Sequence, residues 1–270
     1  MLKEINLDLK IKIETNKNSS DLIIVNSHER SGTHFLMNSI DHCFQFYKSK
    51  PFLNLDLIRL CSVVNFYDSK SLSNFFEQLI IQKNSSIIKS HFNAEFFYNL
   101  DEATLNKIKF LFIYREPISV LKSFWIFINN CNWYEGPKIN NFKEFCFSQP
   151  GGQVLRYQYS QYENFISRYL HMLNGWFNFK KKNKNIYFVS YDELNANYPE
   201  VIEKIGKFLN MKAINKIKYD RKEFFEVKFN KYLSNLIFDP KDTEAINEYI
   251  NNKAKNLELN SFINLKKINY

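Results

Sequence analysis

The chain carries an oxyanion-binding pattern near its N-terminal end, formed by Arg30, Ser31, Gly32 and Thr33. Glycine lets the backbone approach an anion closely, and the two hydroxyl groups add hydrogen-bond donors. An apolar run at 22–25 precedes the pattern, and apolar residues at helical spacing follow it. A strand, a small-residue turn and a helix N-terminus together favour phosphate binding, because the first N–H groups of a helix are unpaired. Taken alone, the same residues would equally suit a turn with a helix cap.

Lys89 and His91 follow a second apolar run, at positions 87–88. In parallel sheets ligands bind beyond the carboxyl ends of the strands, so both side chains are expected at that edge. A neutral histidine can take the proton of an attacking hydroxyl, and a lysine offers positive charge to an anionic transition state. By itself, His91 would also suit an ordinary hydrogen-bonded histidine.

A third set of residues follows the apolar run 109–114, which leads directly into Arg115. Pro117 suits the first turn of a helix that we expect to continue to about Ile128, and Ser123 lies about two turns along it. An arginine fork and a hydroxyl can together hold a second phosphate. In isolation, the same two side chains would be a solvated arginine and a helix serine.

The apolar runs predict strands at 22–25, 86–89, 109–114 and 186–190, and helices at about 34–47, 117–128 and 199–209. This alternation predicts a single α/β domain over 1–270, with a central, mainly parallel sheet flanked by helices. The stretch 129–152 contains the Gly-Pro and Pro-Gly-Gly pairs of the sequence. We expect a long loop or lid there, on the acceptor side of the site.

The composition excludes disordered and repetitive chain classes, since the 270 residues include 27 Phe and 16 Tyr but only 6 Gly and 6 Pro. A net charge of +9 favours an anionic partner. No run is apolar and long enough for a transmembrane helix, and the N-terminus lacks the apolar core of a signal peptide. The cysteines show no CxxC spacing, which argues against a zinc site or a disulfide framework. We therefore expect a cytoplasmic protein.

The phosphate-binding pattern differs from the Walker A loop of nucleotide hydrolases and kinases. The upstream glycine and the lysine before Ser or Thr are missing. The strand at 109–114 ends in Arg115, where a magnesium-dependent enzyme often places an aspartate. The sequence therefore predicts an anion site that uses no metal.

Taken together, the motifs resemble those of the sulfotransferases that use 3′-phosphoadenosine 5′-phosphosulfate (PAPS). The family's K/R-S-G-T loop is similar to residues 30–33, its K-T-H segment to 89–91, its R-x-P-x-x-x-x-x-S motif to 115–123 and its Y-E-D-L segment to 191–194. The four segments occur in the family's order between Val25 and Asn210.

The resemblance implies a P-loop-like fold and in-line transfer of a sulfonate from PAPS to a hydroxyl or amine of a small-molecule, lipid or carbohydrate acceptor. It places His91 as the catalytic base, Arg30 and Lys89 at the transferred group, and Ser123 with Arg115 at the 3′-phosphate. The 5′-phosphosulfate is expected beside Ser31, Gly32, Thr33 and His34. The adenine is expected near Tyr191.

Three positions depart from the family pattern. Glu29 stands where many members have proline, and Arg30 stands where many have a catalytic lysine. The family's later R-K-G loop is only partly matched by Arg221, Lys222 and Glu223. We still expect Arg221 and Lys222 to take part in donor binding.

Other function classes remain open at this point. A P-loop kinase or NTPase would share the strand–turn–helix layout but would depend on magnesium. A nucleic-acid-binding protein would explain the charge, although no RNA- or DNA-binding signature occurs and the cations are scattered. A family member that binds nucleotide without catalysis is a further alternative. We expect no nucleic-acid partner, and the sequence does not indicate the oligomeric state.

Overall fold

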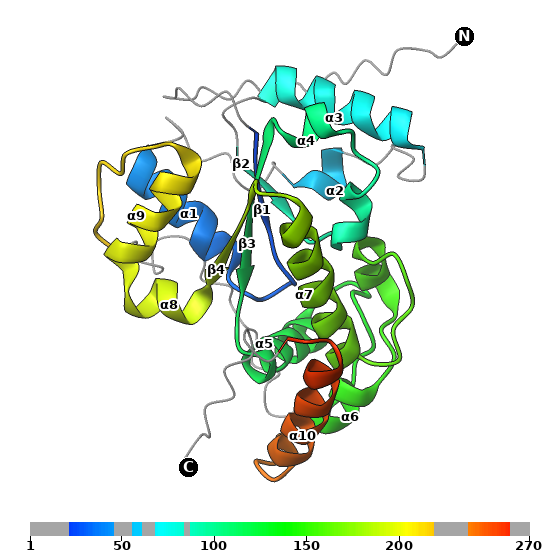
Figure 1. The fold of residues 1–270 in the computed structure, drawn as a ribbon. Coiled ribbons are helices and arrows are strands. Elements are labelled where there is room, and N and C mark those ends of the chain that lie inside the picture. The colour runs from blue at the N-terminus through cyan, green and yellow to red at the C-terminus, as the bar shows by residue number, and fades with distance from the viewer. Residues whose placement is uncertain (1–21, 46–55, 61–67, 84–86, 219–236, 260–270) are drawn as a thin grey trace.

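A computed structural model describes residues 22–45, 56–60, 68–83, 87–218 and 237–259 of the chain. Its centre is a four-stranded sheet in the order β2-β1-β3-β4 (Figure 1). All three strand pairings are parallel. The strands are β1 (Leu22–Asn26), β2 (Ile87–Ser90), β3 (Ile108–Tyr114) and β4 (Ile186–Ser190). The predicted parallel sheet is therefore confirmed, with strand ends within one residue of those expected.

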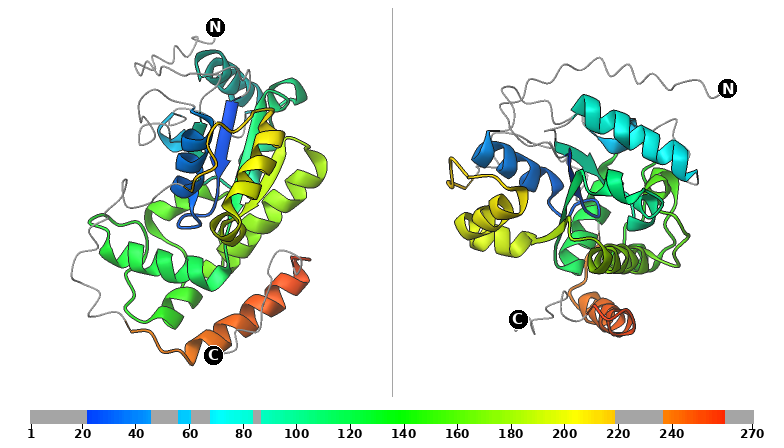
Figure 2. Two further views of the ribbon diagram at one scale, coloured as in Figure 1. Left: turned by 90° about the vertical axis from the view of Figure 1, so that its left-hand side faces the viewer. Right: turned by 45° about the horizontal axis from the view of Figure 1, so that its top comes forward.

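Helices cover both faces of the sheet (Figures 1 and 2). One face is covered by α1 (Thr33–Phe44), α8 (Tyr191–Ala196) and α9 (Tyr198–Leu209). The longer helices on the other side include α3 (Ser69–Lys83), α5 (Pro117–Asn130), α7 (Phe165–Lys182) and α10 (Asp242–Asn256). Shorter elements on that side are α2 (Leu57–Leu60), α4 (Glu102–Leu105), α6 (Phe142–Phe147) and the 3₁₀ turns Ala94–Phe97 and Gly152–Tyr157.

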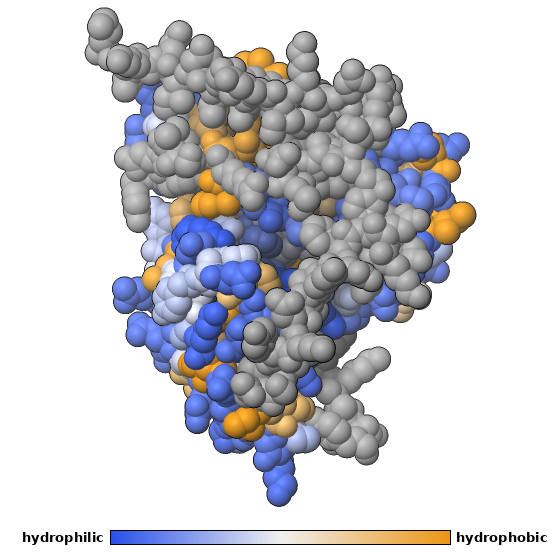
Figure 3. All heavy atoms as spheres, turned by 180° about the vertical axis from the view of Figure 1, so that it is seen from behind, coloured by the Kyte–Doolittle hydropathy of each residue, from blue (hydrophilic) through white to orange (hydrophobic). Residues whose placement is uncertain are grey.

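The two faces have separate hydrophobic cores because side chains alternate along each strand. Ile23 and Val25 of β1 pack on the α1 and α9 side, whereas Leu22 and Ile24 pack on the side of α5 and α7. All five residues of β1 are fully buried, as expected for a central parallel strand. In the view of Figure 3, hydrophilic side chains predominate and hydrophobic ones form small groups on the described surface.

The helix expected from Pro117 is confirmed as α5, with proline in its first turn. The Glu116 carboxylate accepts hydrogen bonds from the N–H groups of Ile118 (2.8 Å) and Ser119 (2.6 Å). This cap begins the helix directly after β3, so Arg115 is held between a strand end and a helix N-terminus.

The predicted lid at 129–152 is only partly a loop, because it contains α6. Phe142 and Phe145 lie three residues apart on one face of this helix and are fully buried, and the Asn141 side chain accepts the N–H of Glu144. Burial of aromatic side chains at helical spacing outweighs the nearby Gly and Pro signals here. Trp133 and Tyr134, in the loop before α6, are 49% and 60% exposed.

Within the described ranges, no helix combines the length and apolar character needed to cross a bilayer.

Candidate active site

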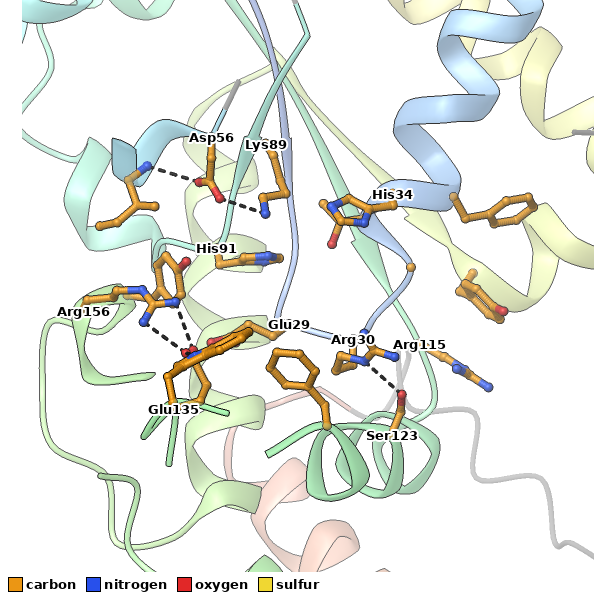
Figure 4. Close-up of a pocket in the computed structure, with 18 residues that line it drawn as sticks. Glu29, Arg30, His34, Asp56, Lys89, His91, Arg115, Ser123, Glu135 and Arg156 are labelled. Atoms are coloured by element: carbon orange, nitrogen blue, oxygen red, sulfur yellow. Dashed lines mark hydrogen bonds and ion pairs between the residues drawn. The ribbon is translucent and has the colours of Figure 1, made fainter. Parts of the chain in front are cut away.

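A cavity of about 630 Å³ lies at the carboxyl edge of the sheet. It brings together residues from the loop after β1, the end of β2, the end of β3, helix α5, the start of α8 and the segment 133–157 (Figure 4). Of the residues singled out from the sequence, those lining it are Glu29, Arg30, Gly32, Thr33, His34, Lys89, His91, Arg115, Ser123 and Tyr191.

Gly32 is the residue on which the loop geometry depends. Its φ of +104° lies in the left-handed region, and a Cβ added there would lie 2.5 Å from Cδ2 of Tyr191. Glycine therefore permits both the turn and the close approach of the tyrosine ring. The loop is closed by a 2.6 Å hydrogen bond between the hydroxyls of Ser27 and Thr33. The first residues of α1 line the cavity. No described side chain caps this helix, so its first N–H groups are available to an anion.

Arg30 and Ser123, predicted to contact different parts of one donor, are hydrogen-bonded to each other. Nε of Arg30 donates to Oγ of Ser123 at 3.2 Å, and the guanidinium lies 5.2 Å from the ring centre of Phe127. Burial lowers the pKa of Arg30 below the ordinary arginine value. This cluster therefore joins the loop to α5.

Arg115 lies next to Tyr191, the tyrosine expected near the adenine. Its guanidinium is 4.4 Å from the ring centre of Tyr191, a cation–π distance. Its Nε is buried and has no hydrogen-bond partner among the described residues. Neither Arg115 nor Arg30 has an ion pair with a described carboxylate, so two positive groups are available for an anion.

His91 is held in a single neutral tautomer. Its Nδ1 lies 2.9 Å from the carbonyl oxygen of Ser27, and because a carbonyl only accepts, Nδ1 carries the proton. Burial, and then the charge of Lys89, lower the pKa of His91. The imidazole is therefore neutral at pH 7, with Nε2 as the nitrogen that can accept a proton.

Lys89 forms an ion pair that the sequence did not predict. Its Nζ lies 2.8 Å from Oδ2 of Asp56, a buried residue at the start of α2 that also lines the cavity. Asp56 and Lys89 are brought together only by the fold, because the residues around Asp56 form no recognisable sequence motif with 89–91.

A second unpredicted ion pair borders the cavity on the side away from Arg30 and Arg115 (Figure 4). Arg156 donates through both terminal nitrogens to the buried carboxylate of Glu135, at 3.0 and 3.3 Å. Nε1 of Trp133 donates to the same carboxylate at 2.6 Å. Tyr157 adds an aromatic wall beside His91, with ring centres 5.4 Å apart. This side of the cavity therefore combines fixed charges with aromatic surface.

Glu29, the residue that departs from the usual proline, anchors the loop to α7. Its carboxylate accepts two hydrogen bonds from the fully buried Arg168, at 2.9 and 3.0 Å. Burial alone would raise the pKa of Glu29, but the Arg168 charge and two histidines lower it to about 2. Arg168 also donates to Nε2 of His28, whose pKa burial lowers to about 3. Glu29 is therefore an ionised group that lines the cavity and is paired with Arg168 of α7.

The remaining predicted residues lie at the margin of the site or outside the description. Ser31 is fully buried and its side chain does not line the cavity, while its N–H donates to the carbonyl of His28 at 3.2 Å. His34 is exposed at the rim. Arg221 and Lys222 lie outside the described residues.

Comparison with known families and folds agrees with this geometry. The family model described as sulfotransferase domain matches residues 20–267. The chain belongs to the sulfotransferase family. No curated protein sequence was found to match it.

The fold of this sulfotransferase is shared with several solved structures. Mouse sulfotransferase SULT7A1, complexed with PAP, is 16% identical over 92% of this chain and 89% of its own, with a TM-score of 0.52. The sulfotransferase from Alicyclobacillus acidocaldarius is 10% identical, with coverages of 89% and 94% and a TM-score of 0.51. Retinol dehydratase in complex with androsterone and PAP is 14% identical, with coverages of 88% and 82% and a TM-score of 0.50.

Membership of this family makes the chain an enzyme that transfers sulfonate groups and disfavours the kinase, NTPase and nucleic-acid-binding alternatives. Among the described residues, no group of three or more His, Cys, Asp or Glu side chains is placed to hold a metal ion.

Proposed function

We propose that this sulfotransferase moves the sulfonate of PAPS directly to a hydroxyl or amine of an acceptor, with His91 as the general base. The observation that carries the proposal is the juxtaposition, in one cavity, of a neutral histidine of fixed tautomer, an anion-binding loop and two arginines that form no ion pair with a described carboxylate. Relatives crystallised with PAP, the product that PAPS leaves, support the same donor.

The residues present fit the donor chemically. The N-terminus of α1, with Gly32 and Thr33, and the Arg30 side chain are suited to the 5′-phosphosulfate. Arg115 and Ser123 are suited to the 3′-phosphate, and the buried Nε of Arg115 offers a hydrogen bond that no described residue accepts. The ring of Tyr191 would pack beside the adenine. Ser31 would support the loop from behind, and His34 would lie beside the donor at the rim of the cavity.

In the proposed transfer, the acceptor oxygen or nitrogen forms a bond to sulfur while the bond from sulfur to the 5′-phosphate oxygen breaks. Nε2 of His91 takes the acceptor proton, and the electron pair of the broken bond leaves with the bisphosphate product. Arg30 and Lys89 stabilise charge on the transferred and leaving oxygens, and Ser123 holds Arg30. Catalysis would thus consist of positioning and electrostatic stabilisation around one proton transfer.

The test is transfer of label from ³⁵S-PAPS to a panel containing a phenol (4-nitrophenol), a phenolic amine (tyramine) and a neutral sugar (lactose), with release of PAP measured in parallel. We expect labelled product with at least one acceptor class, and equal activity in EDTA. Absence of both labelled product and PAP release, including release by hydrolysis in water, would overturn the proposal.

A further inference from the structure

Asp56 is one of three carboxylates that line the cavity. Glu29 and Glu135 are paired with arginines, whereas Asp56 is paired with Lys89. Asp56 is 6% exposed and lines the same cavity as His91. Its backbone forms a parallel bridge with Lys89, next to the end of β2. A negative charge here opposes the binding of a doubly phosphorylated sulfate donor, so its presence calls for a role other than donor binding.

The side chain of Asp56 is fixed from two directions. Oδ1 accepts the N–H of Ile58 at 3.2 Å, which holds the carboxylate to the first turn of α2. Oδ2 lies 2.8 Å from Nζ of Lys89. The carboxylate is therefore held in place by the backbone of α2, and the Lys89 ammonium forms an ion pair with it (Figure 4).

Lys89 needs such a fixed partner more than the arginines of the site do. Its four-carbon chain is flexible and its ammonium is a point charge with three donors, whereas a guanidinium is a planar, preorganised fork. One of the three donors is used by Asp56, which leaves two for the oxygens of a bound sulfonate. The lysine is only two residues from His91 on the same chain segment, so its location determines where positive charge lies relative to the base.

We propose that Asp56 is a positioning residue that fixes the Lys89 ammonium beside His91 for sulfonate transfer. The inference rests on the proposed function, because it assigns Asp56 a part in that reaction. Asp56 contributes orientation and no affinity for the donor.

The experiment is a double-mutant cycle with Asp56→Asn, Lys89→Met and the double variant. Turnover is followed as PAP release from PAPS, with the panel acceptor that supports it or with water as the acceptor, and PAP affinity is measured by calorimetry. We expect Asp56→Asn to lower kcat about 10- to 100-fold, the effect of a misplaced catalytic group. PAP should bind equally well or more tightly, because a negative charge has left the cavity.

In the Lys89→Met background the same substitution should change kcat less than about threefold, because the group that Asp56 orients is already absent. An equal loss in both backgrounds would show that Asp56 acts independently of Lys89 and would overturn the inference. Weaker PAP binding by Asp56→Asn would do the same, because it would make the residue part of the donor-binding structure.

Asp68 provides a matched control. It precedes α3 as Asp56 precedes α2, and its Oδ1 accepts the N–H of Lys70 at 3.1 Å, but it is exposed and lies outside the cavity. Asp68→Asn should leave kcat unchanged, and an equal loss there would attribute the Asp56 effect to helix capping.

Two failures are distinguishable from a wrong assignment of Asp56. If Asp56→Asn does not fold because Lys89 is left unpaired, the double variant removes both charges. Its comparison with Lys89→Met then measures what Asp56 does independently of Lys89, and a loss of more than about threefold there overturns the inference. If wild-type protein releases no PAP, the proposed function itself has failed. A working wild type with an additive cycle contradicts only the role of Asp56.

Discussion

The carbonyl oxygen of Ser27 determines which nitrogen of His91 can act as a base. Because that oxygen only accepts, the proton stays on Nδ1, and Nε2 keeps its lone pair. The same contact orients the ring at the end of β2, next to Lys89. In the proposed transfer, Nε2 is therefore the nitrogen that takes the acceptor proton.

We expect His91→Asn to lower kcat by about 10² to 10⁴, the usual effect of removing a general base. Asparagine can still donate to the Ser27 carbonyl, so folding and PAP affinity should be retained. Steady-state kinetics with ³⁵S-PAPS, together with calorimetry of PAP binding, separate these effects. Turnover near that of the wild type would show that another group is the base.

The pH dependence of kcat/KM follows from the lowered pKa of His91 in the free enzyme. The active form is the neutral one, which is lost as pH falls through that pKa. Burial lowers the pKa of His91, so the acidic limb of the profile should be centred below the ordinary histidine value of about 6.5. A pH–rate profile measures this directly. An acidic limb centred above 6.5 would contradict the assignment.

At this scale the sequence predicts the residues that lie in contiguous motifs and misses their partners. Arg30, His91 and Arg115 stand at strand ends, and a parallel sheet brings all strand ends to one edge. Asp56 and Glu135 have no such signal. They lie in the site because they form ion pairs with residues distant in sequence. The fold brings such partners together, so the sequence alone does not indicate them.

The element on which the site depends most is the loop between β1 and α1. Two neighbours determine its shape. Tyr191 of α8 packs on Gly32 from the cavity side, and Arg168 of α7 holds Glu29 from behind. The loop is therefore supported by helices from both layers. Substitutions at Gly32 and Glu29 test the two contacts separately.

Gly32→Ala should lower both stability and PAP affinity. The substitution places a Cβ at a left-handed backbone position and against the Tyr191 ring, at a cost of about 1 to 3 kcal/mol. Thermal unfolding and calorimetry of PAP binding measure the two effects. Gly151→Ala is the control, because Gly151 has an extended backbone and its Cβ would meet only an ordinary contact with Tyr134. Equal tolerance of the two substitutions would contradict the role given to Gly32.

Glu29→Gln should lower the free energy of unfolding by about 3 to 5 kcal/mol, because it leaves the buried Arg168 charge without its partner. Urea unfolding at pH 7 measures this change. The control is Glu193→Gln, which breaks an exposed pair with Lys204 and should change the free energy of unfolding far less than Glu29→Gln does. Similar losses in the two variants would show that the Glu29 pair does not stabilise the loop.

The sequence predicts the strands of the sheet well because each is a short run rich in β-branched or aromatic residues. The two central strands are almost entirely buried, and the edge strand β4 is partly buried. It predicts less of the layer that covers the sheet. Helix α6 was expected to be loop because Gly and Pro pairs surround it, and its stability comes from Phe142 and Phe145 packing near α7 and α10. This packing depends on helices distant in sequence, so it cannot be predicted from the residues of α6 alone.

For the whole molecule, the parallel sheet and its two cores explain why one edge carries the chemistry. Helices on both faces bury the strands, so the strand ends and the loops that follow them are the part of the sheet open to ligands (Figures 1 and 4). The groups proposed to bind the donor come from the loop after β1, from the end of β3 with α5, and from α8, all of which line the cavity. The charged and aromatic groups on the opposite wall come from the segment between α5 and α7. We therefore expect donor binding and acceptor choice to be separable by mutation.

The most direct test of the account is thermal unfolding of the protein with PAP and, separately, with ATP and magnesium. We predict that PAP alone, in the presence of EDTA, stabilises the fold by about 2.7 kcal/mol when it is supplied at about 100 times its Kd. ATP with magnesium should have little effect. Stabilisation by magnesium ATP without any response to PAP would contradict the central claim that this cavity binds the PAPS donor.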